Sequence, residues 1–152
     1  MERNHRTTFE SAHAMLNDSG LPAIFWTYAA EYATYIYNCL PTETAVGYMS
    51  PIQARYGLVP DVSRCRRFGC VCYTHIPRET REKGFDDKAY KCYFLGIHHA
   101  TQAYLVWIID MSVEIVTPNM LFDEAHTVTL KLDNVVVPVS QDRKSIKDFI
   151  YL

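Results

Sequence analysis

Residues 68–76 read FGCVCYTHI, and Pro77 closes this run. A short run rich in β-branched and aromatic side chains, bounded by turn residues, is typical of a β-strand. Similar runs follow at residues 90–97, 103–109, 113–117 and 120–122. Short strands separated by frequent turns predict a small closed or half-closed β-barrel rather than a parallel sheet.

The half of the chain before these strands has helical periodicity. Apolar residues within 1–17 recur at the spacing of one buried stripe, and Gly20 follows in the position of a C-cap. A second helix is predicted over residues 22–39, where apolar and aromatic side chains cover more than half of the circumference. Pro41 ends this helix, and a third, short helix is predicted over 51–57.

Local signals mark the boundaries of these helices. Ser19 or Gly20 is in position to cap the start of the second helix, and Ser50 is in position to cap the third. Residues 42–49 between those helices are expected to form a turn-like loop. Residues 58–65 are expected to form a linker to the strands.

Composition and charge limit the classes of function. The chain has 152 residues, of which 49% are apolar, and a net charge of −2, so no global field attracts nucleic acid or membranes. Residues 64–91 are the exception, with eight Lys and Arg against four Asp and Glu, and any contact with a polyanion is expected there or near the N-terminus. No apolar run approaches the roughly 20 residues of a membrane helix, so we expect an intracellular protein, nuclear or cytoplasmic, without membrane contact.

The five cysteines are predicted to be free thiols. Their odd number and the absence of a signal peptide and of a CxxC motif favour a reducing compartment. A zinc site is conceivable from the nearby residues Cys65, Cys70, Cys72 and His75. The spacing is unusual for structural zinc, however, and buried free cysteine is the favoured interpretation.

The residues alone reveal no complete active site. A GxGxxG motif, a phosphate-binding P-loop and a nucleophile elbow are all absent from the sequence.

The opening stretch MERNHRT leaves two alternatives. Thr7 to Glu10 fit a capping box, which would start the first helix after residue 7 and leave Glu2 in a frayed tail. Alternatively, Glu2 is a catalytic residue that is separated from its partners.

A resemblance to a known family covers residues 1 to about 124. The segments that carry it are MERNHRTTFESAHAML, the stretch from NDSGLP to FGCVCYTHIP, FDDKAYKCYFLGI, AYLVW and MLFDE. In this order and with similar gaps, they resemble the downstream part of the integrase in copia-type retrotransposon Pol polyproteins. The resemblance implies an α+β chain in three parts. These are helices from the end of an RNase H-like integrase core and those that follow it at 1–60, a retroviral polymerase SH3-like β-barrel at 66–126, and a C-terminal extension at 127–152.

The resemblance also implies a role for the opening stretch. Glu2 matches the last of three metal-binding acids, which in this family hold the magnesium ions of DNA integration. Arg3 and Arg6 would then lie on the DNA-facing helix, where they could contact phosphate. The two aspartates that complete the metal site lie upstream in the family. We therefore expect that the chain alone binds no catalytic metal and is not an enzyme.

Three functions stay open. The first is a non-catalytic integrase fragment that makes at most weak contact with DNA or RNA. Its predicted basic contacts are Arg3, Arg6, Arg64, Arg66, Arg67, Arg78, Arg81, Lys83, Lys88 and Lys91. Interleaved acids offer a plainer interpretation of the later ones, a solvated loop of mixed charge. The second is a protein-interaction module that uses the SH3-like barrel, and the third is an integrase or nuclease completed by another chain.

Two further expectations follow from the resemblance. Helix 22–39 would lack the sheet of the integrase core, so its aromatic stripes, including Phe25 and Tyr32, are expected to be exposed or covered by self-association. Pro118 falls where the family has a strand. Because proline cannot donate to the ladder, that strand must lie at an edge or be interrupted.

Overall fold

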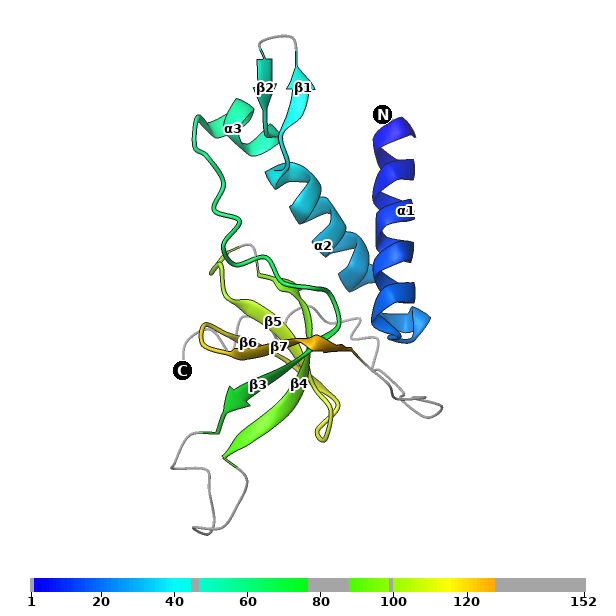
Figure 1. Cartoon of the computed structure of the whole chain (residues 1–152), viewed down its shortest axis with the longest axis vertical. Helices are drawn as coiled ribbons and strands as arrows, with labels where there is room; N and C mark the ends of the chain where they lie inside the picture. The colour runs from blue at the N-terminus through cyan, green and yellow to red at the C-terminus, as the bar shows by residue number, and fades with distance from the viewer. Residues whose placement is uncertain (1, 45–46, 77–87, 99, 128–152) are drawn as a thin grey trace.

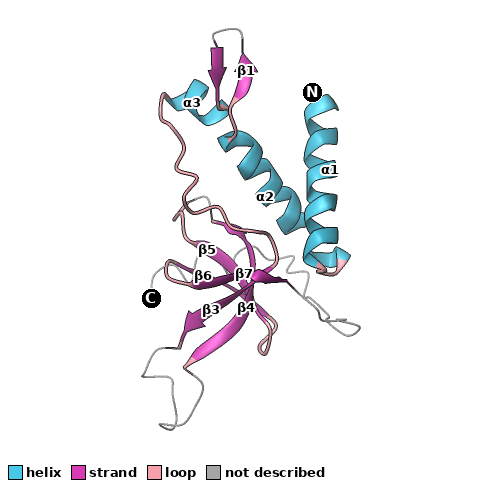
Figure 2. Cartoon of the chain, viewed as in Figure 1, coloured by secondary structure: helices cyan, strands magenta, loops and turns pink. Residues whose placement is uncertain are grey.

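The computed structural model describes residues 2–44, 47–76, 88–98 and 100–127. The helices gather at one end of the molecule and the larger sheet at the other (Figures 1 and 2). The helical elements are α1 Glu2–Ser19, the 3₁₀ turn η1 Ala23–Phe25, α2 Trp26–Cys39 and α3 Pro51–Tyr56. The strands are β1 Thr42–Thr44, β2 Gly47–Met49, β3 Cys70–His75, β4 Ala89–Ile97, β5 Tyr104–Ile108, β6 Val113–Thr117 and β7 Leu121–Thr127.

The predicted helix ends are mostly confirmed. Gly20 has a φ of 72° and its N–H donates to the carbonyl of Leu16, which closes α1 as a left-handed C-cap. Ser50 accepts a hydrogen bond from the N–H of Gln53 at 3.1 Å, and Gly57 ends α3 with a φ of 70°. The N-cap predicted for the second helix is wrong, because the structure begins that segment at Pro22 without a side-chain cap.

Two other expectations for the helical half are also wrong. The helix α1 begins at Glu2, so the capping-box interpretation with a frayed tail does not hold. Residues 42–49 contain the two strands β1 and β2, which pair antiparallel, where the sequence predicted only a loop. Each of these strands has three residues, too few for an alternating pattern to stand out.

The larger sheet contains five antiparallel strands in the order β6-β5-β4-β3-β7. The sequence predicted a closed or half-closed barrel, and the closed alternative is wrong, because β6 and β7 do not pair with each other within the described residues. Pro118 falls in the connection between β6 and β7, and β6 is an edge strand, as expected for this proline.

The open sheet is nevertheless strongly curled. Only residues 118–120 join the two edge strands, and four residue steps span at most about 14 Å. In addition, the rings of Tyr104 on β5 and Phe122 on β7 have centroids 4.9 Å apart, although β4 and β3 separate these strands. Phe94 on β4 contacts both rings edge-on. These three aromatic side chains fill the concave side of the sheet.

Helix α2 packs directly on the sheet, which corrects the expected exposure of its aromatic stripe. Phe25, fully buried just before α2, meets Trp107 of β5 edge-on at 5.4 Å. Tyr32 meets Phe94 of β4 in the same way at 5.2 Å. Apolar side chains on the curled sheet thus cover the stripe that contains Phe25 and Tyr32, while self-association of the chain stays a prediction. Trp26 stays half-exposed and stacks on Phe9 of α1.

One hydrophobic core therefore joins the helices to the sheet. Buried residues from α1, α2, β3, β4 and β5 belong to a single cluster. The RNase H-like origin of residues 1–60 stays a prediction, and residues 127–152 lie almost wholly outside the described part of the chain. None of the described helices is long and apolar enough to cross a membrane.

Candidate nucleic-acid interface

The structure describes only some of the predicted site residues. Glu2 and Arg3 lie in the first turn of α1, but their side chains are outside the described part. Arg78, Arg81 and Lys83 also fall outside the described residues. The remaining predicted contacts divide into two groups, those that contact a carboxylate and those that contact none within the described residues.

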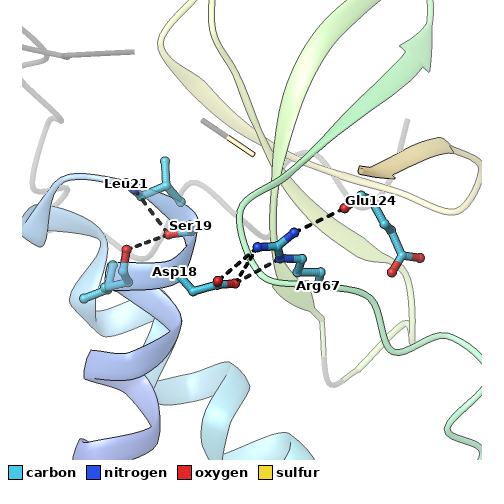
Figure 3. A network of polar contacts seen from close by, with 6 residues as sticks. Asp18, Ser19, Leu21, Arg67 and Glu124 are labelled. Carbon is cyan, nitrogen blue, oxygen red and sulfur yellow. Dashed lines mark hydrogen bonds and ion pairs between the residues drawn. The ribbon is translucent and has the colours of Figure 1, made fainter. Parts of the chain in front are cut away.

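Arg67 belongs to the first group. Its Nε and Nη2 donate to the two carboxylate oxygens of Asp18 at 2.9 and 3.0 Å, a bidentate pair (Figure 3). Its Nη1 also reaches the backbone carbonyl of Glu124 at 3.5 Å. The hydrogen bonds from Arg67 lower the pKa of Asp18, so this carboxylate stays ionised. One guanidinium thus ties the end of α1 to the start of β3 and to β7.

Arg66 is held at the same junction. Its Nε lies 3.4 Å from Glu124 Oε1, and its guanidinium lies over the ring of Phe122. The backbone of Arg66 is fixed by Tyr32, whose hydroxyl donates to the Arg66 carbonyl at 2.6 Å and accepts from the Arg66 N–H at 2.9 Å. Burial raises the pKa of Tyr32, so the hydroxyl keeps the proton that it donates.

Arg6 is the third arginine with an acidic partner. Its Nε donates to Glu10 at 2.8 Å, one helical turn further along α1. Both side chains are well exposed, and such pairs contribute only about 0.3–0.5 kcal/mol. This contact neutralises Arg6 locally without fixing it to another part of the fold.

Arg64, Lys88 and Lys91 form the second group. All three are exposed, and within the described residues none makes an ion pair. Arg64 donates from Nη1 to the carbonyl of Gln102 at 2.6 Å, which leaves its other donors available. Among the predicted contacts in the described part of the chain, these three side chains can meet a phosphate without displacing a carboxylate.

Lys91 also borders a half-open hollow of about 370 Å³ on the face of β3, β4 and β7 that the cysteines do not occupy. Tyr73 is the register partner of Lys91, and both line this hollow. On β7, Asp123 accepts a hydrogen bond from Nδ1 of His126 at 2.8 Å. The hollow is therefore lined by an aromatic side chain, by one lysine, and by one aspartate that is already hydrogen-bonded to a histidine.

The described residues contain no group of three or more His, Cys, Asp or Glu that could hold a metal ion. The prediction of buried free cysteines is confirmed for four of the five, namely Cys39, Cys70, Cys72 and Cys92. Cys72 and Cys92 are register partners, and the Cys72 thiol donates to the Cys92 carbonyl at 3.5 Å. Burial raises the pKa of both thiols, which favours their neutral form.

Sequence reasoning missed Asp18 and Glu124, the acids that engage Arg67 and Arg66. Their partners are 49 and 58 positions away in the chain. No local spacing rule connects residues at such distances. The only sequence signal is that both acids border predicted elements, and this alone does not identify a partner.

Comparison with known proteins defines the class of the sheet-forming half. Residues 70–135 match the retroviral polymerase SH3-like domain family. The chain as a whole is related to the Pol polyproteins of copia-type retrotransposons. It is 34% identical over 123 residues to the retrovirus-related Pol polyprotein from transposon RE1 of Arabidopsis thaliana, and 31% identical over 144 residues to that from transposon RE2 of the same plant. These matches cover 81% and 95% of the chain.

The chain spans about a tenth of the length of these relatives, 8% of the RE1 protein and 10% of the RE2 protein. A similar match, 29% identical, joins it to the Pol polyprotein from transposon TNT 1-94 of Nicotiana tabacum. An uncharacterised mitochondrial protein of Arabidopsis thaliana is 41% identical over 71 residues, which cover 47% of the chain and 58% of that protein. No solved structure matches the chain significantly. The resemblance drawn from the sequence is thus confirmed.

Proposed function

We propose that the chain is a non-catalytic segment of a retrotransposon Pol polyprotein that makes weak, sequence-independent contact with DNA or RNA. The observation that carries this proposal is the division of the basic residues. Arg6, Arg66 and Arg67 each contact a carboxylate, whereas Arg64, Lys88 and Lys91 contact none within the described residues. Because only three of the predicted cations lack an acidic partner within the described residues, we expect the nucleic acid to be contacted through few phosphates.

The non-catalytic part rests on the resemblance. It assigns Glu2 to the metal site, and this one carboxylate cannot hold two magnesium ions. The purified chain should therefore neither cut nor join DNA ends in magnesium. Cleavage that depends on magnesium and disappears in Glu2→Gln would contradict this part, and would favour an enzyme completed by another chain.

The affinity for a labelled DNA duplex, measured by fluorescence anisotropy over a series of salt concentrations, tests the binding part. For three phosphate contacts the slope of log K against log salt should be about −2.7, because each contact contributes about −0.9. Arg64→Ala and Lys91→Ala should each make the slope shallower by about 0.9. Arg55→Ala is the matched control, because it removes an exposed cation from α3, outside the candidate interface.

A slope near zero would refute the electrostatic contact. An equal effect of Arg55→Ala and Arg64→Ala would show that net charge, and not these particular cations, governs binding. Single-stranded RNA in the same titration gives the preference between the two nucleic acids, since each contact there contributes about −0.7 to the slope.

One observation favours the protein-interaction alternative. Tyr73 and Leu121 are register partners on β3 and β7, and they are 38% and 75% exposed. Two adjacent apolar side chains on the open sheet could contact a protein partner. A partner retained after nuclease treatment, and lost on Leu121→Asp but kept on Leu58→Asp, would support this second function. Leu58 is the control because it is similarly exposed but lies in the linker.

A further inference from the structure

The three arginines with acidic partners are not equivalent. Arg6 pairs with Glu10 one turn away on the same helix, whereas Arg67 pairs with Asp18 on a different element. The Asp18 contact is bidentate, with two N–H groups of one guanidinium meeting two oxygens of one carboxylate. This fork is the geometry by which arginine also binds a phosphate group.

The fold holds both partners of this pair in place. Asp18 is in the last turn of α1, and its neighbour Ser19 is fully buried. The Ser19 hydroxyl donates to the carbonyl of Leu16 and accepts from the N–H of Leu21 (Figure 3). On the other side, Gly69 donates its N–H to the carbonyl of Phe94 at 2.8 Å. Asp18 and Arg67 are therefore each close in sequence to a residue that is fixed in the fold, Ser19 and Gly69, and no long loop separates either one from the core.

The pair is nevertheless at the surface. The side chains of Arg67 and Asp18 are 40% and 58% exposed, so a phosphate group from solution can reach this guanidinium. A phosphate that takes this fork must displace the carboxylate, because Nε and Nη2 of Arg67 already donate to the two oxygens of Asp18.

We infer that Asp18 is an autoinhibitory competitor, which occupies the phosphate-binding fork of Arg67 and so weakens the contact of this chain with nucleic acid. Glu124 acts in the same direction on Arg66, through a single and longer contact of 3.4 Å. This inference rests on the proposed function and deepens it. Nucleic acid binds through the cations without an acidic partner and gains Arg67 only when Asp18 withdraws.

The test compares the unmodified full chain with three variants in the same salt titration on duplex DNA. Asp18→Asn keeps an oxygen that can accept from Arg67 but removes the negative charge, so the fold is preserved. The slope of log K against log salt should steepen by about 0.9, the contribution of one added phosphate contact. Glu43→Gln is the matched control, because it removes one exposed acid of β1 that has no arginine partner within the described residues.

A double variant, Asp18→Asn with Arg67→Gln, distinguishes the effect of a released guanidinium on the slope from the effect of a loosened fold. The steeper slope should return to that of the unmodified chain, since the cation that was released is gone. Circular dichroism at each salt concentration confirms that the variants stay folded.

The outcomes separate this inference from the proposed function. A steeper slope in Asp18→Asn alone supports the inference. A slope that steepens equally in Glu43→Gln, or that persists in the double variant, overturns it and leaves the proposed function standing. If the unmodified chain binds and Asp18→Asn changes nothing, the inference is likewise overturned. If neither form binds DNA at low salt, both are overturned.

Discussion

The backbone at Gly69 approaches Ser19 so closely that a β-carbon on residue 69 would lie 2.3 Å from the β-carbon of Ser19. Gly69 also has a φ of 71°, a region that other residues rarely adopt. The strand β3 begins at the next residue, and α1 ends at Ser19. This contact therefore sets how closely the helical half packs on the sheet.

Replacement of Gly69 by alanine should destabilise the chain strongly. The positive φ costs about 1–2 kcal/mol and the forced separation from Ser19 costs about 1–3 kcal/mol more. Gly57→Ala is the control, because Gly57 has nearly the same φ, 70°, but has nothing within 4 Å of the added carbon. Urea denaturation of both variants measures the difference, and equal losses would show that the approach to Ser19 is unimportant.

Tyr32→Phe should remove the hydroxyl that bridges the backbone of Arg66. Tyr32 is almost fully buried, and its loss leaves an N–H and a carbonyl of Arg66 without their partner. We expect a decrease in the free energy of unfolding of about 1–3 kcal/mol. The control Tyr48→Phe removes an exposed hydroxyl from β2 and should change stability by less than about 0.5 kcal/mol. A similar effect of both substitutions would contradict the bridging role.

The parts of the fold that the sequence predicts correctly depend on local signals. Ser50, Gly57 and Gly20 act on residues within one helical turn, so their roles can be inferred without knowledge of tertiary structure. The strand positions follow from periodicity in the same way. The contact of Phe25 with Trp107 could not be inferred, because 82 residues separate the two and either ring could pack elsewhere.

For the candidate site, too, local features could be predicted from the sequence and long-range contacts could not. The basic character of residues 64–91 is evident from the sequence, and the exposure of Arg64, Lys88 and Lys91 agrees with it. The partner of Arg67 could not be found in this way, because Asp18 comes close only after α1 packs on the sheet. A list of cations in a sequence therefore overstates a nucleic-acid interface wherever folding brings carboxylates to them.

The shared core predicts that helices and sheet unfold together. Phe25→Ala removes a fully buried ring that packs on Trp107, and the expected loss is about 3–5 kcal/mol. Far-ultraviolet circular dichroism, which reports the helices, and the fluorescence of Trp107 on β5, measured with Trp26 of α2 replaced by phenylalanine, should shift to lower urea by the same amount. Phe9→Ala, which removes a half-exposed ring stacked on Trp26, should cost about 1 kcal/mol or less. Separate transitions for the two signals would indicate that residues 1–60 fold independently of the sheet.

The buried thiols predict a loss of stability in alkali. Burial raises the pKa of Cys70 and Cys92 from 9.0 to about 11, so the folded state holds these protons more tightly than the unfolded state. Their contribution is complete below pH 9.0 and is lost as the pH rises towards about 11. Urea denaturation at intervals across this range should show a falling free energy of unfolding. The variant Cys70→Ala/Cys92→Ala should start less stable but fall less steeply, because it lacks two of the groups that titrate. An equal slope in both proteins would show that the tyrosines, and not these thiols, cause the alkaline loss.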